Sequence, residues 1–431
     1  MKACPACGRM YPDDSGFCPV EGAALGSATQ VPARADSQDA RVGELVCGRY
    51  EIRRVVADGG MGRVFEALDL QQRKSVALKI LHPEVAGDEV AVERFKREFA
   101  VSRELPHDHI VEVFDFTATS DHSYALVMEF LYGESLRATL KRERVLPPGR
   151  LVRMLSQIAI GMDAAHHKGL VHRDLKPDNL FLCQKADGDT VKVLDFGSVK
   201  DTAEDAKKLT MLGTTIGSPY YMAPEQAQGL DTLDQRADVW ALAAIVYECV
   251  SGRLPFQGTN GPSTLLQILT KEPVPASVAG RDAKHVVPRT LDFALAKAFR
   301  KLAAERTESV GALADSVGRA YGLVGDHRSW AVRHENELSL EVAERARDVM
   351  AAPSTATAEF FNEQGALGDS NPPLPPSFGD QVTDRQVAAT AREAFDGPSL
   401  VVPPKRSIVP QLAAALVSAV VLALLCYLLL R

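Results

Sequence analysis

Four polar side chains at fixed offsets near the middle of the chain constrain its fold more than any other feature. Residues 172–179 read HRDLKPDN, and residues 195–197 read DFG. Asp174 is a proton acceptor, Lys176 is a cation, and Asn179 and Asp195 offer oxygen ligands of the kind that Mg²⁺ prefers. Phosphoryl transfer needs these groups in one place. The fold therefore has to bring two polar loops together.

Both runs resemble the catalytic loop and the metal-binding loop of bacterial, eukaryotic-type serine/threonine protein kinases, and they match without a substitution. The resemblance implies an α+β fold of two lobes, the first β-rich and the second helical. It implies Asp174 as the catalytic base, Lys176 as a cation beside the transferring phosphoryl group, and Asn179 and Asp195 as metal ligands. The cofactors would be ATP and Mg²⁺ or Mn²⁺. A lysine at the offset of Lys176 is typical of kinases that act on Ser and Thr hydroxyls of proteins.

A glycine-rich run upstream aligns with the family's nucleotide-binding loop, G-x-G-x-x-G-x-V, whose glycines let backbone N–H groups approach phosphates. Ala57 replaces the first glycine, and its methyl group is expected to alter loop flexibility or nucleotide affinity. Alone, such a run fits a turn between two strands equally well. Lys79 follows in an apolar strand, at the place of the family lysine that contacts the α and β phosphates. The predicted nucleotide-binding residues also include Asp58, Gly59, Gly60, Met61, Gly62, Val64 and Ala77.

Lys79 needs a charged partner, because a lysine is hard to bury without one. Residues 93–99 predict an amphipathic helix. Glu98 aligns with the family's helix glutamate that pairs with this lysine, and Glu93 is the weaker candidate. Two solvated surface charges are the alternative.

Residues 126–131 resemble the strand and hinge against which adenine packs in the family. Met128 would be the gatekeeper beside the adenine ring, although a methionine in an apolar run also serves as ordinary core. The backbone of Glu129 and Leu131 would bind the adenine edge.

Residues 197–225 resemble an activation loop that ends in the run MAPE at 222–225. In the family, the arginine at the place of Arg173 pairs with a phosphate on this loop. We expect autophosphorylation, because such a phosphate would make charge-assisted hydrogen bonds that order the loop. The candidate acceptors are Thr210, Thr214 and Thr215, with the first two favoured. A polar loop of ordinary threonine content is the alternative.

Two further matches lie toward the C-terminus. Asp238 aligns with the family's helix aspartate that braces the catalytic loop, and Arg306 aligns with the arginine that pairs with Glu225. These roles are structural rather than catalytic.

Composition divides the chain into five parts. Residues 45–324 show strong apolar periodicity and form the only stretch long enough for a large core, which predicts the kinase domain. The flanking parts are a zinc-ribbon-like module at 1–26, a flexible linker at 27–44 and a largely disordered juxtamembrane linker at 325–407. Within the last of these, a helix is expected near 335–351. Residues 408–430 predict a transmembrane helix.

Three cysteines near the N-terminus, Cys4, Cys7 and Cys18, have the spacing of a zinc knuckle pair that lacks its fourth cysteine. Glu21 stands at the fourth place, and a carboxylate can ligate zinc. The arrangement resembles a small zinc ribbon, so a structural Zn²⁺ site of three cysteines and one glutamate is expected. A redox CxxC pair is the less favoured alternative, because no thioredoxin-like βαβ pattern follows.

The run 412–430 carries no charged residue and is long enough to cross the hydrocarbon core of a bilayer as a helix. Lys405 and Arg406 precede it and only Arg431 follows, which favours a cytoplasmic kinase domain by the positive-inside tendency. We therefore expect a single-pass protein of the inner membrane. A buried core helix is the alternative.

The formal net charge of −7 gives no basic surface for nucleic acid, so the expected partners are protein substrates and the membrane. Whether the chain forms a homodimer is left open.

A pseudokinase or scaffold that binds nucleotide or partners without catalysis is the alternative function, and Ala57 is the one feature that favours it. A small-molecule kinase fits less well, because it should lack Ser218, which stands in the place of the family's Gly-Thr-Pro threonine, and the MAPE run at 222–225, which build a platform for protein substrates.

Overall fold

The computed structural model describes residues 2–3, 10–11, 39–60, 62–121, 123–196, 219–230 and 232–351. The chain divides into two units, Met1–Gln364 and Gly365–Arg431, and all of the described residues belong to the first. Near the N-terminus, β1 (Lys2–Ala3) and β2 (Met10–Tyr11) pair as a short antiparallel ribbon. The folded body that carries the site spans residues 39–351.

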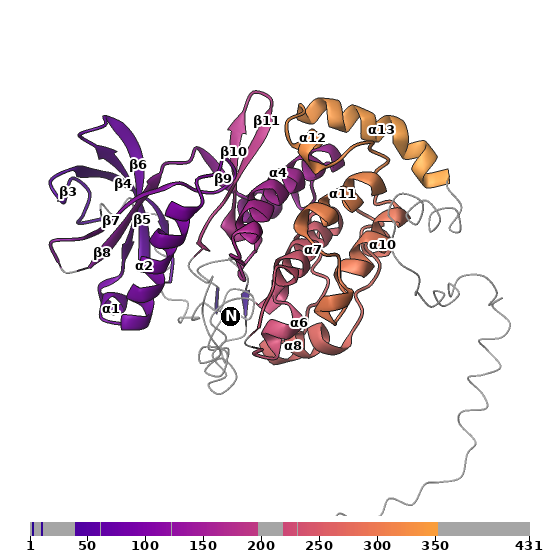
Figure 1. The fold of residues 1–431 in the computed structure, drawn as a ribbon, viewed down its shortest axis with the longest axis horizontal. Helices are drawn as coiled ribbons and strands as arrows, with labels where there is room; N and C mark the ends of the chain where they lie inside the picture. Colours follow the sequence, from indigo (N-terminus) through magenta and orange to yellow (C-terminus); the bar gives the residue numbers. More distant parts are fainter. Residues whose placement is uncertain are drawn as a thin grey trace, which may run out of the picture. The chain divides into compact units, whose positions relative to one another are not determined.

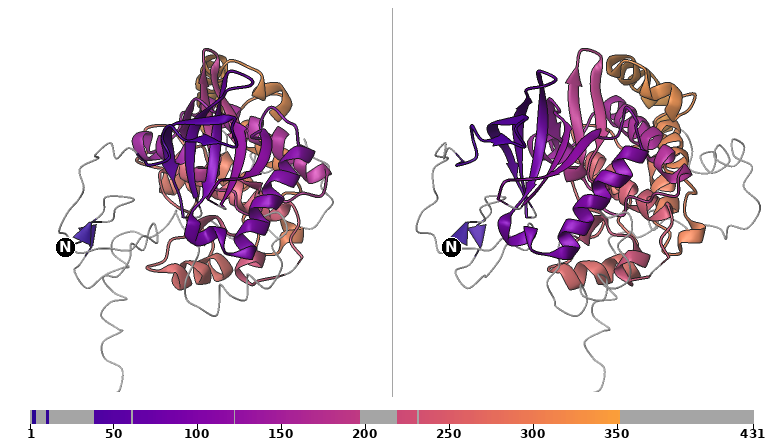
Figure 2. Two further views of the ribbon diagram at one scale, coloured as in Figure 1. Left: turned by 90° about the vertical axis from the view of Figure 1, so that its left-hand side faces the viewer. Right: turned by 60° about the vertical axis from the view of Figure 1, so that its left-hand side comes forward.

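The N-terminal lobe is an antiparallel sheet of six strands in the order β3-β4-β5-β6-β8-β7 (Figure 1). Its two faces pack separately, because side chains alternate along each strand. Ala125 and Val127 of β8 join the cluster on one face, whereas Leu126 joins Phe95 of α2 on the other. Figure 2 shows α2 alongside the sheet. The elements are β3 (Leu45–Val46), β4 (Tyr50–Asp58), β5 (Gly62–Asp69), β6 (Lys74–Leu81), α1 (Pro83–Ala86), α2 (Glu89–Glu104), β7 (Val113–Ala118) and β8 (Tyr124–Glu129).

The C-terminal lobe is helical around one hydrophobic cluster, with a small three-stranded sheet at its border. Its central helix, α7, is buried along almost its whole length, as its apolar sequence predicts. The elements are β9 (Gly133–Ser135), α3 (Leu136–Glu143), α4 (Pro148–His167), β10 (Leu180–Lys185), β11 (Gly188–Val193), α6 (Pro224–Ala227), α7 (Arg236–Ser251), α8 (Gly261–Thr270), α9 (Ala276–Ala279), α10 (Arg289–Ala298), α11 (Val310–Ala320), α12 (His327–Ala331) and α13 (Glu335–Ala351), with 3₁₀ turns at Pro177–Asn179, Pro219–Tyr221 and Ala303–Glu305. The predicted two-lobed architecture is confirmed.

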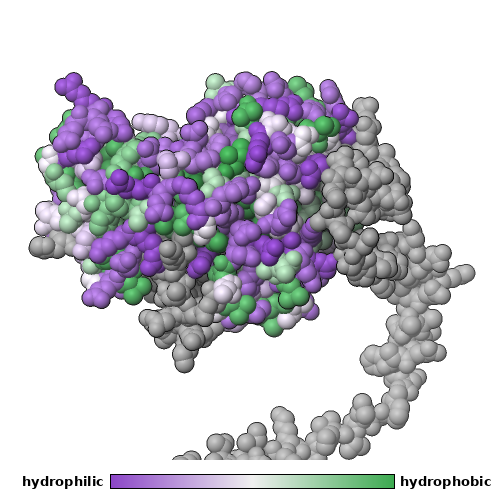
Figure 3. Space-filling view, in the orientation of Figure 1, coloured by the Kyte–Doolittle hydropathy of each residue, from purple (hydrophilic) through white to green (hydrophobic). Residues whose placement is uncertain are grey.

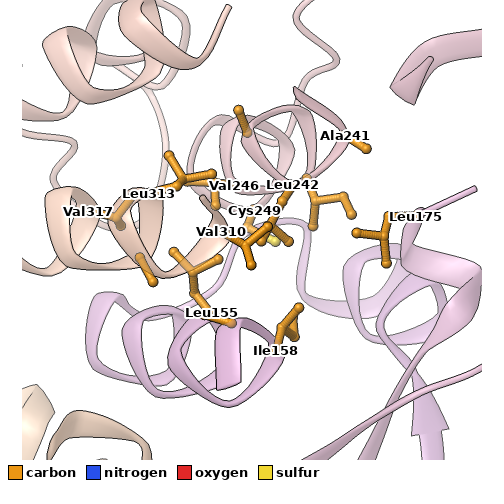
Figure 4. Packing of buried hydrophobic residues seen from close by; sticks show 14 of the residues in the cluster. Leu155, Ile158, Leu175, Ala241, Leu242, Val246, Cys249, Val310, Leu313 and Val317 are labelled. Atoms are coloured by element: carbon orange, nitrogen blue, oxygen red, sulfur yellow. The ribbon is translucent and has the colours of Figure 1, made fainter. Parts of the chain in front are cut away.

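The hydrophobic cluster of the C-terminal lobe also fixes the loop that carries Asp174. Figure 4 shows side chains of α4, α7 and α11 meeting in this cluster, with Leu175 pointing into it opposite Ala241 and Leu242. Leu175 is 1% exposed, so the loop residue that follows Asp174 is anchored in the core. The polar residues on either side of Leu175 are thereby held at the surface of a rigid support.

The folded domain extends beyond the predicted boundary at residue 324, so that part of the linker prediction is wrong. Trp330 of α12 is fully buried, and its Nε1 donates to the Val324 carbonyl at 3.1 Å. A Cβ atom at Gly318 of α11 would lie 2.1 Å from the indole ring, so this glycine makes room for it. Leu338 of α13 is buried in the same cluster. The helix expected near 335–351 is present as α13, packed on the domain.

The N-terminal boundary also differs from the prediction. Residues 39–44, the lead-in segment, belong to the folded body rather than to a flexible linker. The Gly43 N–H donates to the Ile52 carbonyl at 2.8 Å, and the Ile52 N–H donates to the Glu44 carbonyl at 3.0 Å. Arg41 forms an ion pair with Asp121 in the turn between β7 and β8. The segment thus continues the edge of the sheet beyond β3.

The face drawn in Figure 3 carries mostly hydrophilic side chains with smaller apolar groups among them, the surface typical of a domain exposed to water. Among the helices in the described ranges, none is long and apolar enough to cross a membrane. Several predictions fall outside those ranges and stay predictions: the span 408–430, the glycine-loop residue Met61, the zinc ligands Cys4, Cys7, Cys18 and Glu21, and the acceptors Thr210, Thr214 and Thr215.

Candidate active site

The ammonium of Lys79 joins three parts of the fold. It comes from β6 and lies 3.1 Å from Glu98 Oε2 of α2 and 2.6 Å from Asp195 Oδ1, which follows β11. Glu98 is buried, whereas the Asp195 side chain is 45% exposed and open to a ligand. The structure therefore brings together the three residues that the sequence placed in a strand, a helix and a loop.

The charges of Lys79 and Asp195 stabilise each other, because the two groups lie 2.6 Å apart. Burial alone would lower the pKa of Lys79, but the carboxylates of Asp195 and Glu98 raise it above its ordinary value. Burial raises the pKa of Glu98 and also acts to raise that of Asp195, yet the Lys79 charge holds the pKa of Asp195 well below its usual range. Lys79 therefore remains a cation and Asp195 a carboxylate at neutral pH.

Asp174 lies at the centre of a short hydrogen-bond network. Its Oδ2 accepts from Lys176 Nζ at 2.7 Å and from Asn179 Nδ2 at 3.2 Å, and its backbone carbonyl accepts from Asn179 Nδ2 at 2.9 Å. Because the amide nitrogen of Asn179 is directed to Asp174, its Oδ1 is the atom left for a metal. The network holds a base, a cation and a neutral oxygen donor together.

Asp238 at the start of α7 positions this loop from beneath. Its fully buried carboxylate accepts the backbone N–H of His172 at 2.8 Å and of Arg173 at 2.9 Å. His166 Nε2 also lies 2.8 Å from it. Arg173 has a φ of 67°, a conformation that costs energy in a residue other than glycine, so these bonds stabilise a strained backbone.

The Asp195 loop is fixed to the same support. His172 Nε2 donates to the Leu194 carbonyl at 2.8 Å, and Phe196 is fully buried with its ring centre 4.8 Å from that of His172. Asp195 has a φ of 58°, which aspartate adopts more readily than most residues. The buried Phe196 and the left-handed turn together direct Asp195 toward Lys79.

The glycine-rich loop joins β4 to β5, and its alanine is accommodated without strain. Ala57 pairs with Val64 in the strand register, Asp58 pairs with Arg63, and Ala57 has no positive φ. Gly62 is different, because a Cβ atom there would lie 2.3 Å from the Ile80 carbonyl oxygen. Among the glycines of this loop, only Gly62 has neighbours that leave no room for a side chain. The alanine at position 57 fits the strand without strain, so it gives no structural reason to expect loss of nucleotide binding.

We expect Gly62→Ala to weaken Mg·ATP binding by roughly fivefold to 150-fold, because the backbone of β5 must move away from Ile80 at a cost of about 1–3 kcal/mol. Titration of the nucleotide by calorimetry measures the change. Gly60→Ala is the matched control, since nothing lies within 4 Å of a Cβ atom there. Equal dissociation constants for the two variants would contradict the steric argument.

The strand residues around Lys79 form a surface suited to a flat ring. Val64 pairs with Lys79 across β5 and β6, and Ala77 pairs with Met128 across β6 and β8. Ala77 and Lys79 share a face of the sheet because they are two residues apart. Met128 is partly buried against the cluster that contains Phe95, so it contributes to the core as well as to this surface.

The hinge residues offer backbone rather than side-chain groups. The Glu129 carboxylate accepts from Lys192 Nζ at 2.6 Å and from the Glu112 N–H at 2.8 Å, so its side chain is already engaged. Leu131 follows β8 and is partly exposed. The Glu129 N–H is engaged as well, because it donates to the Glu112 carbonyl at 2.9 Å. An adenine edge would therefore meet the Glu129 carbonyl or the backbone of Leu131.

A buried ion pair fixes the segment that follows the predicted activation loop. Glu225 and Arg306 are joined by two hydrogen bonds of 2.6 and 2.5 Å, and both are buried. The predicted pairing of these two residues is present in the structure. Arg306 also donates to three backbone carbonyls, of Arg236, Arg300 and Lys301. This cluster holds the residues that follow the activation loop against α7.

Arg137 of α3 is a site residue that the sequence did not reveal. It donates to Asp178 at 3.2 Å, to Glu248 at 2.8 Å and to the Tyr221 hydroxyl at 2.5 Å. These partners lie 41, 111 and 84 residues away in the chain, so no local pattern indicates them. Arg137 links the catalytic loop to the segment beyond the activation loop.

The donor set fits Mg²⁺ and a nucleotide. Asp195 and the Oδ1 of Asn179 supply the hard oxygen ligands that Mg²⁺ takes in small number, leaving its other positions to phosphate and water. Lys79 offers the positive charge for phosphate oxygens, and the β4–β5 turn with Gly59, Gly60 and Gly62 leads into β5, whose Val64 pairs with Lys79. These residues could hold Mg·ATP.

Residues 50–308 match the family model for the protein kinase domain. Over 282 residues, 65% of this chain, the sequence is 36% identical to the serine/threonine-protein kinase pkn3 of Myxococcus xanthus, covering 51% of that protein. It is 34% identical to the serine/threonine-protein kinase PknH of Mycobacterium tuberculosis over 75% of this chain and 50% of that one. The chain thus spans about half the length of these curated relatives.

Among solved structures, the crystal structure of the M. tuberculosis PknI kinase domain is similar to 65% of this chain and 99% of its own, with 27% sequence identity and a TM-score of 0.51. The match to the family model covers more than half of the 431 residues and includes Lys79, Asp174 and Asp195. The chain therefore belongs to the protein kinase domain family.

Proposed function

We propose that this chain is an ATP-dependent protein kinase that phosphorylates Ser and Thr hydroxyls of proteins. The observation that carries the proposal is the position of Lys79 Nζ between Glu98 and Asp195, an arrangement that active kinases require. Lys176 beside Asp174 and the names of the relatives favour Ser and Thr over Tyr as acceptors.

Each residue of the site has a separate role in phosphoryl transfer. The acceptor hydroxyl oxygen bonds to the γ-phosphorus while the bond from that phosphorus to the bridging oxygen breaks, and ADP leaves with the electron pair. The hydroxyl proton passes to the carboxylate of Asp174, and Lys176 stabilises charge on the transferring group. Lys79 orients the α and β phosphates. A Mg²⁺ ion held by Asp195 and Asn179 would neutralise phosphate charge.

Incubation of the purified chain with γ-labelled ATP, Mg²⁺ and an acceptor protein tests this function. We expect label on phosphoserine and phosphothreonine after acid hydrolysis, because Lys176 accompanies Asp174 in the site. Label found on phosphotyrosine alone would contradict the assignment of the acceptor. No transfer at any acceptor, with Mg·ATP still bound, would favour a pseudokinase.

We also propose that the activation loop is phosphorylated by the kinase itself, at Thr210 or Thr214 in preference to Thr215. Arg173, which adjoins Asp174, supplies a cation near the base to which a loop phosphate could bind. Mass mapping of the active chain should locate the phosphate. Three unmodified threonines in fully active protein would refute the proposal.

For localisation, we propose that residues 408–430 anchor the chain in the inner membrane with the kinase domain in the cytoplasm. The uncharged run and the cations Lys405 and Arg406 before it support this arrangement. The chain should remain in the membrane pellet after a high-salt wash. Release into the supernatant by that wash would argue against a spanning helix.

At the N-terminus, we propose a structural zinc ion bound by Cys4, Cys7, Cys18 and Glu21. So few residues could hardly fold without a metal, and three thiolates with one carboxylate suit tetrahedral zinc. A peptide of residues 1–26 should bind about one zinc ion. Three thiols that titrate freely in the presence of zinc would exclude the site.

A further inference from the structure

The lead-in segment reaches the nucleotide-binding loop directly. Asp39, its first residue, forms an ion pair with Arg63, the residue after Gly62. The same segment is held at its other contacts by Arg41 with Asp121 and by backbone bonds to β4. A stretch of chain that precedes the kinase domain in sequence is therefore bonded to the loop that covers the nucleotide site.

Arg63 bridges two acids from different parts of the chain. Its Nε donates to Asp58 Oδ2 at 2.9 Å, and Asp58 lies opposite it across the β4–β5 hairpin. One terminal nitrogen of the guanidinium also donates to Asp58, and the other donates to Asp39. The planar fork of an arginine suits such double pairing. Arg63 thus ties the hairpin to the lead-in segment.

The position of Arg63 in the strand separates this contact from the nucleotide itself. Val64 pairs with Lys79 across the sheet, so Val64 shares a face with the phosphate-binding lysine. Successive side chains of a strand point to opposite faces, which puts Arg63 on the face away from Lys79. Arg63 and Asp39 are therefore placed to act on the nucleotide through the backbone of the hairpin rather than by direct contact.

Asp39 is held more firmly than an ordinary surface acid. Its side chain is only 9% exposed, and its Oδ1 accepts the backbone N–H of Arg41 at 2.9 Å. Burial acts against the charged form, but the Arg41 N–H and the Arg63 guanidinium hold the pKa of Asp39 below its ordinary value. The carboxylate is therefore charged at neutral pH, and its loss would leave Arg63 with Asp58 as its remaining partner.

We propose that Asp39 is a positioning residue for nucleotide binding, which acts through Arg63 to hold the β4–β5 hairpin over Lys79. Nucleotide affinity then depends on a residue that lies before the family-matched region, which begins at residue 50. This inference rests on the proposed nucleotide site but adds a residue outside it. Because the hairpin backbone is what Asp39 fixes, the effect falls on binding rather than on the transfer step.

Binding of Mg·ADP to the full chain tests the proposal by calorimetry. We expect Asp39→Asn and Arg63→Gln each to raise the dissociation constant by roughly threefold to tenfold, the effect of a half-shielded ion pair. In the double variant the two effects should not add, because Asp39 acts through Arg63. The kcat at saturating ATP should stay at the wild-type value in Asp39→Asn.

Asp121→Asn is the matched control, since it removes the other ion pair of the lead-in segment without touching the hairpin. We expect a wild-type dissociation constant for it. An unchanged constant in Asp39→Asn, or additive effects in the double variant, would overturn the positioning role. An equal increase in Asp121→Asn would overturn it too, in favour of general anchoring. A wild-type chain that binds no Mg·ADP would refute the proposed function itself.

Discussion

Asp174→Asn is expected to lower kcat for phosphoryl transfer by about 10²–10⁴-fold, the usual contribution of a positioned general base. The amide cannot take the hydroxyl proton, although it is nearly the same size as the carboxylate. Its oxygen can still accept from Lys176 and Asn179, which now bond to Asp174 Oδ2. The dissociation constant of Mg·ATP should therefore change little. Initial-rate measurements with labelled ATP give both parameters.

The control for this variant is Asp234→Asn, the same chemical change at an exposed residue that pairs with Arg236. It should leave kcat within the error of the measurement, because exposed ion pairs contribute little. Thermal unfolding of both variants at the wild-type temperature would exclude a folding defect. Equal incorporation by wild type and Asp174→Asn would remove Asp174 from the mechanism.

Trp330→Ala is expected to lower the free energy of unfolding by about 3–5 kcal/mol, the cost of emptying a large buried site. The indole is fully buried against Gly318 and donates a hydrogen bond to the Val324 carbonyl. Collapse of α12 cannot fill the space, since Leu338 of α13 packs on the same cluster. Urea unfolding followed by fluorescence and by circular dichroism measures the change.

Val332→Ala is the matched control, because Val332 directly follows α12 and its side chain is 79% exposed. Its effect should lie within about 0.5 kcal/mol, as for most surface substitutions. A similarly small change in the free energy of unfolding for Trp330→Ala would mean that residues 325–351 do not belong to the cooperative core of the domain.

Much of the site could be predicted because its signals are local. Asp174, Lys176 and Asn179 fall within one short run, and Lys79 has a fixed offset from the glycine-rich run. Burial indicated only that Lys79 needs a charged partner, and the resemblance to the kinase family favoured Glu98 over Glu93. The structure brings Glu98 to 3.1 Å from Lys79.

The contacts that could not be predicted join residues far apart in the chain. Arg137 meets Glu248 at a separation of 111 residues, and Arg153 donates to the Arg333 carbonyl at a separation of 180. Nothing in the neighbourhood of an arginine in the sequence tells which distant acid or carbonyl it will meet. Such contacts depend on the packed arrangement of helices, which only the three-dimensional structure provides.

The domain boundary near residue 324 is hard to predict for a different reason, because the sequence beyond it is rich in charged residues and its apolar pattern is weak. Leu338 and Val342 are spaced by four residues and both are buried in α13, while Leu340 between them is exposed. That spacing is typical of a helix with one face on a core. Together with the buried Trp330, this spacing accounts for the extension of the domain to α13.

The buried side chains form one large cluster and two small ones, so the two lobes are expected to open independently. The large cluster runs from α4 through α7 and α11 to α13 and includes Val101 near the C-terminal end of α2, whereas the strands of the N-terminal lobe pack in a separate cluster on each face of the sheet. Amide protons of α7 should exchange with deuterium only through global unfolding, and those of β4 and β5 through smaller openings. The lobe that carries Lys79 can then open locally while the lobe that bears Asp174 stays intact.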